Sequence, residues 1–127
     1  VRDFVVGPYF TQIAEHEIIE RITIARRPSR ERWGCYKVAP KLGEYAKSLA
    51  LALVDRDQNT AKLVIGAWSG VPLELENAAT AFLDGADKGA LEMIVQNELK
   101  DKMPSLTAAE RRLHTASVLR AAGQAAS

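Results

Sequence analysis

The sequence has 127 residues, of which 47% are hydrophobic and 26% are charged. This is enough for one domain with a real core, and it excludes disordered, collagen-like and low-complexity chains. The net charge of +1 gives no general attraction to nucleic acid or anionic membranes. The longest apolar run, residues 49–54, is far shorter than the roughly 20 residues that a membrane-spanning helix needs. The single cysteine, Cys35, excludes an internal disulfide and a multi-cysteine metal site.

The first 27 residues predict β structure. The chain begins at Val1 rather than Met and enters a strand-like run at once, which is typical of a piece of a longer protein. Isoleucines alternate with polar residues over 17–25 and predict a strand. Ile19 falls on the polar side of that strand, so we expect another element to cover it. The polar, proline-containing stretch 26–32 is typical of a linker.

The middle of the chain predicts three strands. Residues 33–39 alternate between two faces. Residues 45–54 are nearly all apolar, as in a strand that is buried on both faces. A polar turn at 55–60 connects them to a returning strand at 61–68, and so short a connection predicts antiparallel pairing.

The last third of the chain predicts three helices. Pro72 suits the first turn of a helix that ends before Gly85. A second helix is expected from Asp87 to just before Pro104, and Thr107-Ala-Ala-Glu is a capping box that begins the third. Strands followed by helices predict an α+β fold, in which a small three-stranded antiparallel sheet packs against a three-helix bundle.

Most candidate chemical motifs favour a structural interpretation. The run Asp55-x-Asp57-x-Asn59 imitates a calcium-binding loop but lacks its glycine and closing glutamate, so a hydrated turn is favoured. There is no glycine-rich phosphate loop in the sequence. His114 and Ser117 lie three residues apart without an acidic partner, which favours packing over catalysis. We therefore expect no catalytic residue and no metal ligand in this chain.

Two features of residues 26–41 leave alternatives open. The basic residues of this stretch indicate a solvated linker, and the main alternative is a site for a phosphate-bearing ligand. Nucleic-acid binding has thin support, because Trp33 and Tyr36 are the only aromatic residues of the stretch. Cys35 is expected to be a small buried hydrophobe. Lys37 lies in mid-strand, either as a lysine whose ammonium reaches water from an edge strand or as a cation beside an anionic cofactor. The basic residues are Arg26, Arg27, Arg30, Arg32, Lys37 and Lys41.

Three segments resemble one family. The run Tyr-Lys-Val-Ala-Pro-Lys-Leu-Gly-Glu-Tyr-Ala at 36–46 is similar to the motif that opens the C-terminal domain of the FAD-binding medium subunit of molybdenum hydroxylases. These enzymes are the carbon monoxide dehydrogenase and xanthine dehydrogenase relatives. Residues 3–11 and 17–19 resemble the end of the preceding FAD-binding domain. Pro72, residues 83–85 and residues 116–120 follow in the family's order.

The resemblance implies an electron-transfer role. In this family a large subunit with a molybdenum–pterin centre acts on the substrate, a small subunit carries two 2Fe-2S clusters, and FAD in the medium subunit passes electrons to an acceptor. The family's glycine-rich FAD loops precede the region matched here. The resemblance divides the chain into residues 1–27, the end of the FAD-binding domain, and residues 28–127, the C-terminal α+β domain. It implies a fragment or subunit of an oxidoreductase that is not active alone. The lone thiol and the absence of a signal-peptide pattern lead us to expect a cytoplasmic protein.

Three residues match the family's cofactor-binding positions. Ile19 matches a position that approaches the flavin ring, and Lys37 matches a lysine near the isoalloxazine. Tyr36 matches an aromatic residue of some branches. Glu44 stands where the family commonly has aspartate, and Leu119 where it often has tyrosine, so the resemblance implies a divergent member.

The expected partners are the rest of the FAD domain, the molybdenum-containing large subunit and the iron–sulfur small subunit, with no nucleic acid and no membrane span. The alternative is a non-enzymatic interaction domain that docks a partner through its helical face. Its sequence support is the abundance of alanine in the third helix, which permits close helix approach but also simply favours helix.

Overall fold

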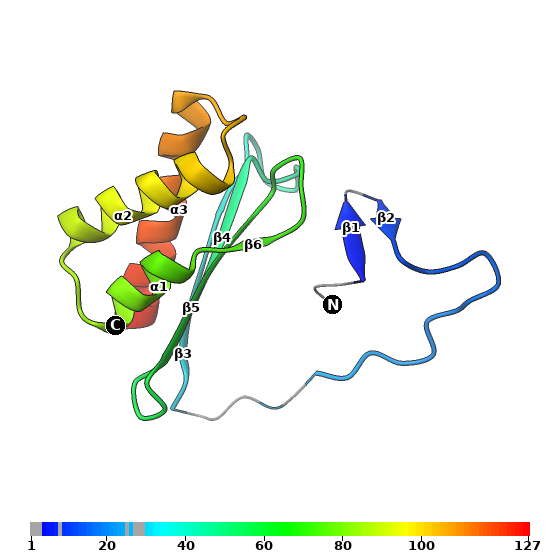
Figure 1. Ribbon diagram of the computed structural model, residues 1–127, viewed down its shortest axis with the longest axis horizontal. Coiled ribbons are helices and arrows are strands. Elements are labelled where there is room, and N and C mark those ends of the chain that lie inside the picture. Colours follow the sequence, from blue (N-terminus) through cyan, green and yellow to red (C-terminus); the bar gives the residue numbers. More distant parts are fainter. Residues whose placement is uncertain (1–3, 8, 25, 27–29) are drawn as a thin grey trace.

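The computed structural model describes residues 4–7, 9–24, 26 and 30–127. A short hairpin at the N-terminal end leads through an extended segment to a four-stranded antiparallel sheet and three helices (Figure 1). The strands and helices are β1 (Val5–Gly7), β2 (Phe10–Thr11), β3 (Arg32–Val38), β4 (Ser48–Asp55), β5 (Thr60–Gly66), β6 (Leu73–Glu74), α1 (Glu76–Leu83), α2 (Lys88–Lys102) and α3 (Ala108–Ala126).

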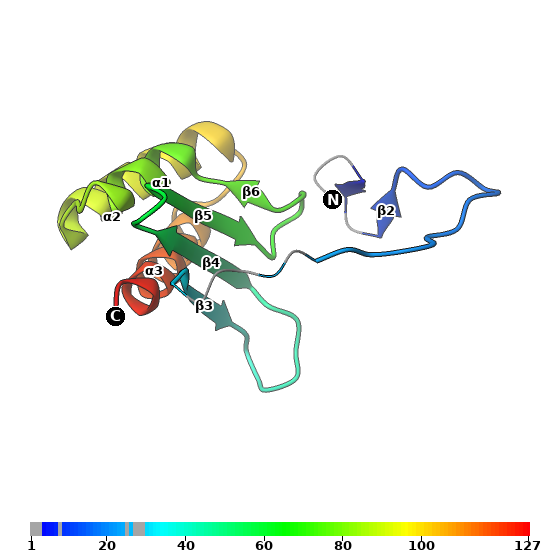
Figure 2. The ribbon, with the colours of Figure 1, turned by 90° about the horizontal axis from the view of Figure 1, so that it is seen from below.

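The sheet has strand order β3-β4-β5-β6 and is covered by helices on one side only. The N-terminal hairpin and the extended segment lie on the other side (Figures 1 and 2). No helix among the described residues combines the length and hydrophobicity needed to cross a lipid bilayer.

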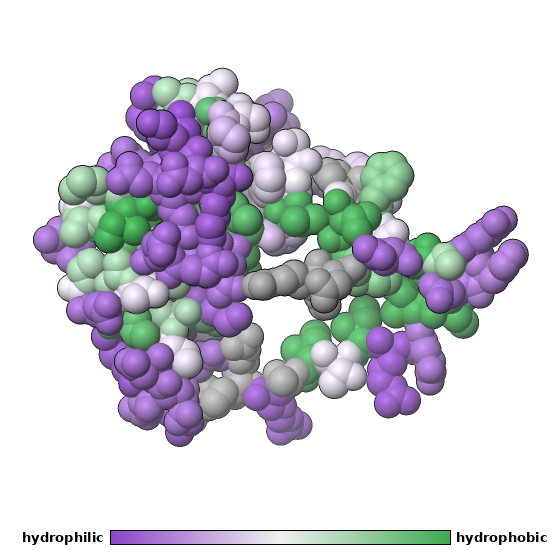
Figure 3. All heavy atoms as spheres, viewed as in Figure 1, coloured by the Kyte–Doolittle hydropathy of each residue, from purple (hydrophilic) through white to green (hydrophobic). Residues whose placement is uncertain are grey.

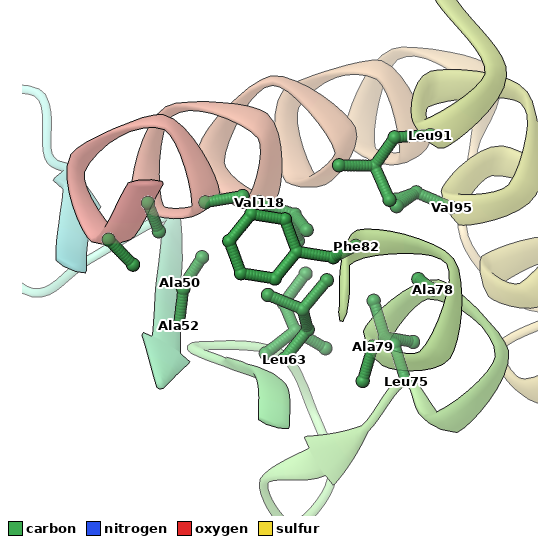
Figure 4. Packing of buried hydrophobic residues seen from close by; sticks show 14 of the residues in the cluster. Ala50, Ala52, Leu63, Leu75, Ala78, Ala79, Phe82, Leu91, Val95 and Val118 are labelled. Atoms are coloured by element: carbon green, nitrogen blue, oxygen red, sulfur yellow. The ribbon is translucent and has the colours of Figure 1, made fainter. Parts of the chain in front are cut away.

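The core lies between the sheet and the helices. Ala50 and Ala52 of β4 are fully buried, and α3 packs over them. Small side chains here let the helix approach the strand closely, while larger residues from β5 and the helices fill the space beside them (Figure 4). These larger buried residues include Leu63, Ile65, Leu75, Phe82, Leu91, Val95, Leu99 and Val118.

Two of the three helices begin as the sequence predicts. Asp87 accepts hydrogen bonds from the amides of Gly89 and Ala90 at the start of α2. Thr107 and Glu110 form the reciprocal capping box of α3. Both devices pair amides that the first turn of a helix leaves without a partner.

The sheet has four strands instead of the predicted three. Residues 73–74 pair antiparallel with β5, through Ile65 opposite Leu73 and Val64 opposite Glu74. Pro72 therefore precedes this short strand rather than opening a helix, and α1 begins at Glu76. A two-residue strand is recognised only by its pairing, which a local sequence pattern does not contain.

Two other strand predictions also fail. Residues 17–24 are extended but pair with no strand among the described residues, and Ala25, the last residue of that prediction, lies outside them. β4 is not buried on both faces, since Leu51 on the side away from the helices is 39% exposed. The predicted linker begins at Arg26, but residues 27–29 also lie outside the described residues. The alternation of isoleucines indicates strand geometry, whereas the pairing partner must come from elsewhere.

The free energy of unfolding should fall as the pH drops below about 6.5. Burial of His114 lowers its pKa from the ordinary value of 6.5, although the Glu110 carboxylate opposes this. The unfolded chain therefore takes up this proton at a higher pH than the folded chain, so the stabilisation is complete above pH 6.5 and is lost as the pH falls through and below that value. Denaturant titrations at about pH 7.5 and about pH 5.5 measure the difference. His114→Gln should reduce it, and an unchanged difference would contradict this assignment.

Candidate functional site

The edge strand β3 presents two different faces. Gly34 is buried against α3 and Tyr36 also contacts α3, so the alternate residues Trp33, Cys35 and Lys37 face the open side of the sheet. Trp33 is 65% exposed, and Cys35 is also exposed. The expectation that Cys35 is a buried hydrophobe is wrong, because the alternation places it on the face that no helix covers.

Lys37 stands at one end of this open face. It lies opposite Leu49 of β4, which in turn lies opposite Gly66 of β5. A Cβ atom at Gly66 would meet no atom within 4 Å, so there is open space beside Leu49. Lys37 is exposed and forms no ion pair within the described residues. The position of Lys37 on an edge strand is as predicted, and its ammonium is available to a ligand or to solvent.

Tyr36 lies on the opposite face of the strand from Lys37. The guanidinium of Arg120 in α3 lies over its ring, 4.7 Å from the centroid, and also donates a hydrogen bond to its hydroxyl. Cation–π attraction and the hydrogen bond both hold this arginine in place. In this structure Tyr36 anchors β3 to α3.

Ile19 lies in the extended segment and is 56% exposed. It lines an open groove of about 860 Å³, together with Phe4, Ile13 and Ile22. Apolar side chains gather at the surface of this segment (Figure 3). Isolated exposed isoleucines are ordinary, but a contiguous set marks a surface that another element covers.

The structure does not bring the three predicted cofactor-binding residues together. Lys37 lies on the open face of the sheet and Tyr36 on the covered face, while the groove around Ile19 includes no residue of β3. Their common role stays a prediction.

The basic stretch forms no continuous patch within the described residues. Arg30 pairs with Asp55 at 3.1 Å and with Asp57 at 3.8 Å. Arg32 and Lys37 stand at opposite ends of β3. Acidic side chains thus pair with part of the basic stretch, and two of its cations, Arg32 and Lys37, are separated by the length of β3.

The candidate calcium loop is a hairpin turn, as expected. One oxygen of Asp55 accepts the amides of Asp57 and Gln58 at 3.1 Å each, and the other faces Arg30. Burial opposes ionisation of Asp55, but the two amides and Arg30 outweigh it and lower its pKa. Asn59 takes the left-handed conformation that such turns need, with φ of 52°.

His114 has a packing role. Its Nδ1 lies 2.9 Å from the Ser48 hydroxyl, and both side chains are buried. Ser117 donates instead to the carbonyl of Leu113 in its own helix. The described residues contain no group of three potential metal ligands.

The sequence interpretation missed a groove between α2 and α3, with a volume of about 560 Å³. Its lining includes the cations Lys88, Arg112 and Arg120 together with small or apolar residues of α3. The sequence signal for this groove was the spacing of residues 112, 116, 120 and 123, which places them on one face of a helix. The groove is lined by Lys88, Glu92, Gln96, Arg112, Ala116, Leu119, Arg120 and Gly123.

Comparison with known proteins identifies the fold. No protein-family model matches the sequence, and no curated protein matches it. Solved structures do match it, among them the cyanide-inactivated form of the Cu,Mo-CO dehydrogenase, with a TM-score of 0.72, and reconstituted CO dehydrogenase from Oligotropha carboxidovorans, with a TM-score of 0.74. Each is 22% identical, and the match covers 98% of this chain but only 46% of the matched chain. The chain therefore has the fold of part of a carbon monoxide dehydrogenase chain, as its resemblance to this group of molybdenum hydroxylases predicts.

Proposed function

We propose that this chain is the C-terminal part of an FAD-carrying electron-transfer subunit in a molybdenum hydroxylase-type oxidoreductase. The observation that carries the proposal is the match of 98% of the chain to a chain of CO dehydrogenase. The chain spans less than half of the matched chains, which leaves room in the complete protein for the main FAD-binding loops. In this proposal residues 1–27 end the FAD-binding domain and residues 28–127 form the domain that follows it.

The open face of the sheet offers residues for one side of a flavin. Leu49 is half-buried there, and a Cβ atom at the neighbouring Gly66 would meet no atom within 4 Å. Lys37, which lies opposite Leu49, would supply a cation to the cofactor. When bound, FAD would supply the electron-carrying chemistry, and a nearby cation stabilises negative charge that develops on the reduced ring. Ile19 enters the proposal on the family resemblance alone, since its groove includes no residue of β3, while Tyr36 holds β3 against α3.

The exposed apolar surfaces fit a piece of a larger assembly. Ile19 is 56% exposed, and Leu51 on the open side of β4 is 39% exposed. We propose that the rest of the FAD domain covers them, and that a molybdenum-containing large subunit and a 2Fe-2S small subunit complete the enzyme. The free thiol of Cys35 fits the reducing cytoplasm as its compartment.

Lys37→Ala in the complete subunit should slow reduction of the flavin by about tenfold and weaken FAD binding much less. The reason is that the ammonium would stabilise negative charge that develops on the ring as it is reduced, whereas most contacts to FAD lie elsewhere. Stopped-flow reduction and FAD titration measure the two effects separately.

Lys37→Arg is the control that keeps the positive charge, and it should retain most of the rate of flavin reduction. Lys62→Ala removes another lysine of the sheet, one that already pairs with Glu74 at 3.5 Å, and should leave flavin reduction unchanged. Unchanged flavin reduction in Lys37→Ala would remove this residue from the proposal.

A further inference from the structure

We propose that the groove between α2 and α3 is the docking site for an acidic segment of a companion protein chain. The inference rests on the proposed function only for the identity of that companion, namely a subunit of the same oxidoreductase. The groove itself lies on the helical layer, away from Lys37 on the open face of the sheet.

Charge is the first argument. Three cations, Lys88, Arg112 and Arg120, line the groove against one acid, Glu92. The lining therefore carries a formal charge of 3 − 1 = +2, whereas the whole chain carries only +1. Glu92 accepts a hydrogen bond from Gln96, and the three cations form no ion pair within the described residues. Such a concentration of unpaired positive charge complements a partner that is negatively charged.

The shape of the groove is the second argument. The lining includes two small residues, Ala116 and Gly123, and the half-buried Leu119. An apolar side chain of a peptide can pack against these residues while neighbouring carboxylates reach the cations of the same groove. Among the described residues, no aromatic side chain lines the groove on which a nucleic-acid base could stack. These features favour an acidic protein segment over RNA.

The third argument is that one of the cations is already positioned. Arg120 is held over the Tyr36 ring and donates to the Tyr36 hydroxyl, so its guanidinium loses little freedom when a carboxylate binds. Its other N–H groups stay available for a bidentate contact. Arginine is among the residues that most often dominate protein interfaces.

The test uses the complete subunit, purified from its native source with whatever companion chains it retains. A zero-length carbodiimide cross-linker joins a lysine to a carboxylate that it contacts. Mass spectrometry should find Lys88 joined to an aspartate or glutamate of a companion chain. The double variant Lys88→Glu/Arg112→Glu should lower the affinity for that companion at least tenfold and leave the FAD content unchanged.

The control variant Lys47→Glu/Lys100→Glu makes the same change in charge at exposed positions outside the groove and should keep the companion. All four side chains are exposed, but Lys88 begins α2 and Lys100 lies in its last turn, so the two reversals change the interaction with the helix dipole in opposite senses. Thermal unfolding therefore checks that both variants are folded at the temperature of the binding assay. If the subunit retains FAD and companions but Lys88 joins none of them and the double variant binds normally, the docking site is wrong and the proposed function stands.

Other outcomes are equally decisive. A companion joined to Lys88 in a protein that never binds FAD would support the groove and contradict the proposed function. Co-purifying RNA that the double variant releases would overturn the choice of a protein partner. A subunit that retains no companion chain at all would overturn the docking proposal.

Discussion

Replacing Glu98 with alanine should destabilise the chain by about 3 kcal/mol. Its buried carboxylate accepts the amides of Asn77 at 3.3 Å and Ala78 at 2.9 Å, in the first turn of α1. The N-cap residue of that helix, Leu75, has no side chain that could do this. Lys102 pairs with the same carboxylate at 2.9 Å. The substitution thus leaves two helix amides and a lysine without their common partner.

Glu92→Ala is the matched control, because Glu92 is an exposed glutamate of the same helix whose side chain accepts a hydrogen bond from Gln96 and forms no ion pair within the described residues. It should change the free energy of unfolding by no more than about 0.5 kcal/mol. Urea titration of both variants measures the difference. Equal stabilities would show that the link between α2 and the start of α1 contributes nothing.

Gly34→Ala should have an effect of similar size, about 3 kcal/mol. A Cβ atom at Gly34 would lie 2.0 Å from the carbonyl oxygen of Ala121 and 2.8 Å from the Cβ of Gln124. A backbone oxygen cannot move aside without shifting α3. The shift would also stretch the 2.9 Å hydrogen bond from the Cys35 amide to the side chain of Gln124. The substitution therefore separates the edge strand from the helix that covers it.

Gly66→Ala tests whether any added methyl group in the sheet has this effect. A Cβ atom there would meet nothing within 4 Å, so the variant should be as stable as the parent or slightly more stable. Thermal unfolding of the two variants separates the predictions. If the Gly34→Ala protein unfolds at the same temperature as the Gly66→Ala protein, the close approach of β3 and α3 is contradicted.

The parts of the fold that a local pattern determines could be predicted from the sequence. The capping box at Thr107, the cap at Asp87 and the turn after Asp55 each use side chains within three residues of the amides that they bind. The alternation in β3 likewise indicates which residues share a face.

The remaining features depend on partners that are distant in sequence. Glu98 caps a helix 20 residues earlier, and β6 is defined only by its pairing with β5. The strand predicted over 17–25 has the alternation of a strand but no neighbour in the described residues. A sequence pattern shows that a segment can form a strand, but it does not supply the second strand.

The candidate site likewise combines features that the sequence predicts with features that depend on distant partners. The resemblance selected Lys37, and the cost of burying a lysine in mid-strand made an edge strand one of its two interpretations, which the position of β3 matches. Neither could show that Tyr36 packs against Arg120, because that contact joins residues 84 positions apart. The cationic groove likewise combines two helices and becomes visible only when they pack together.

Mass spectrometry of the complete source protein, first native and then denaturing, tests the oxidoreductase proposal most directly. We expect the native ions to contain companion chains and the denatured sample to release FAD. The released companions should include a molybdenum-containing chain and an iron–sulfur chain. A complete protein that ionises alone and releases no flavin would contradict the proposed function.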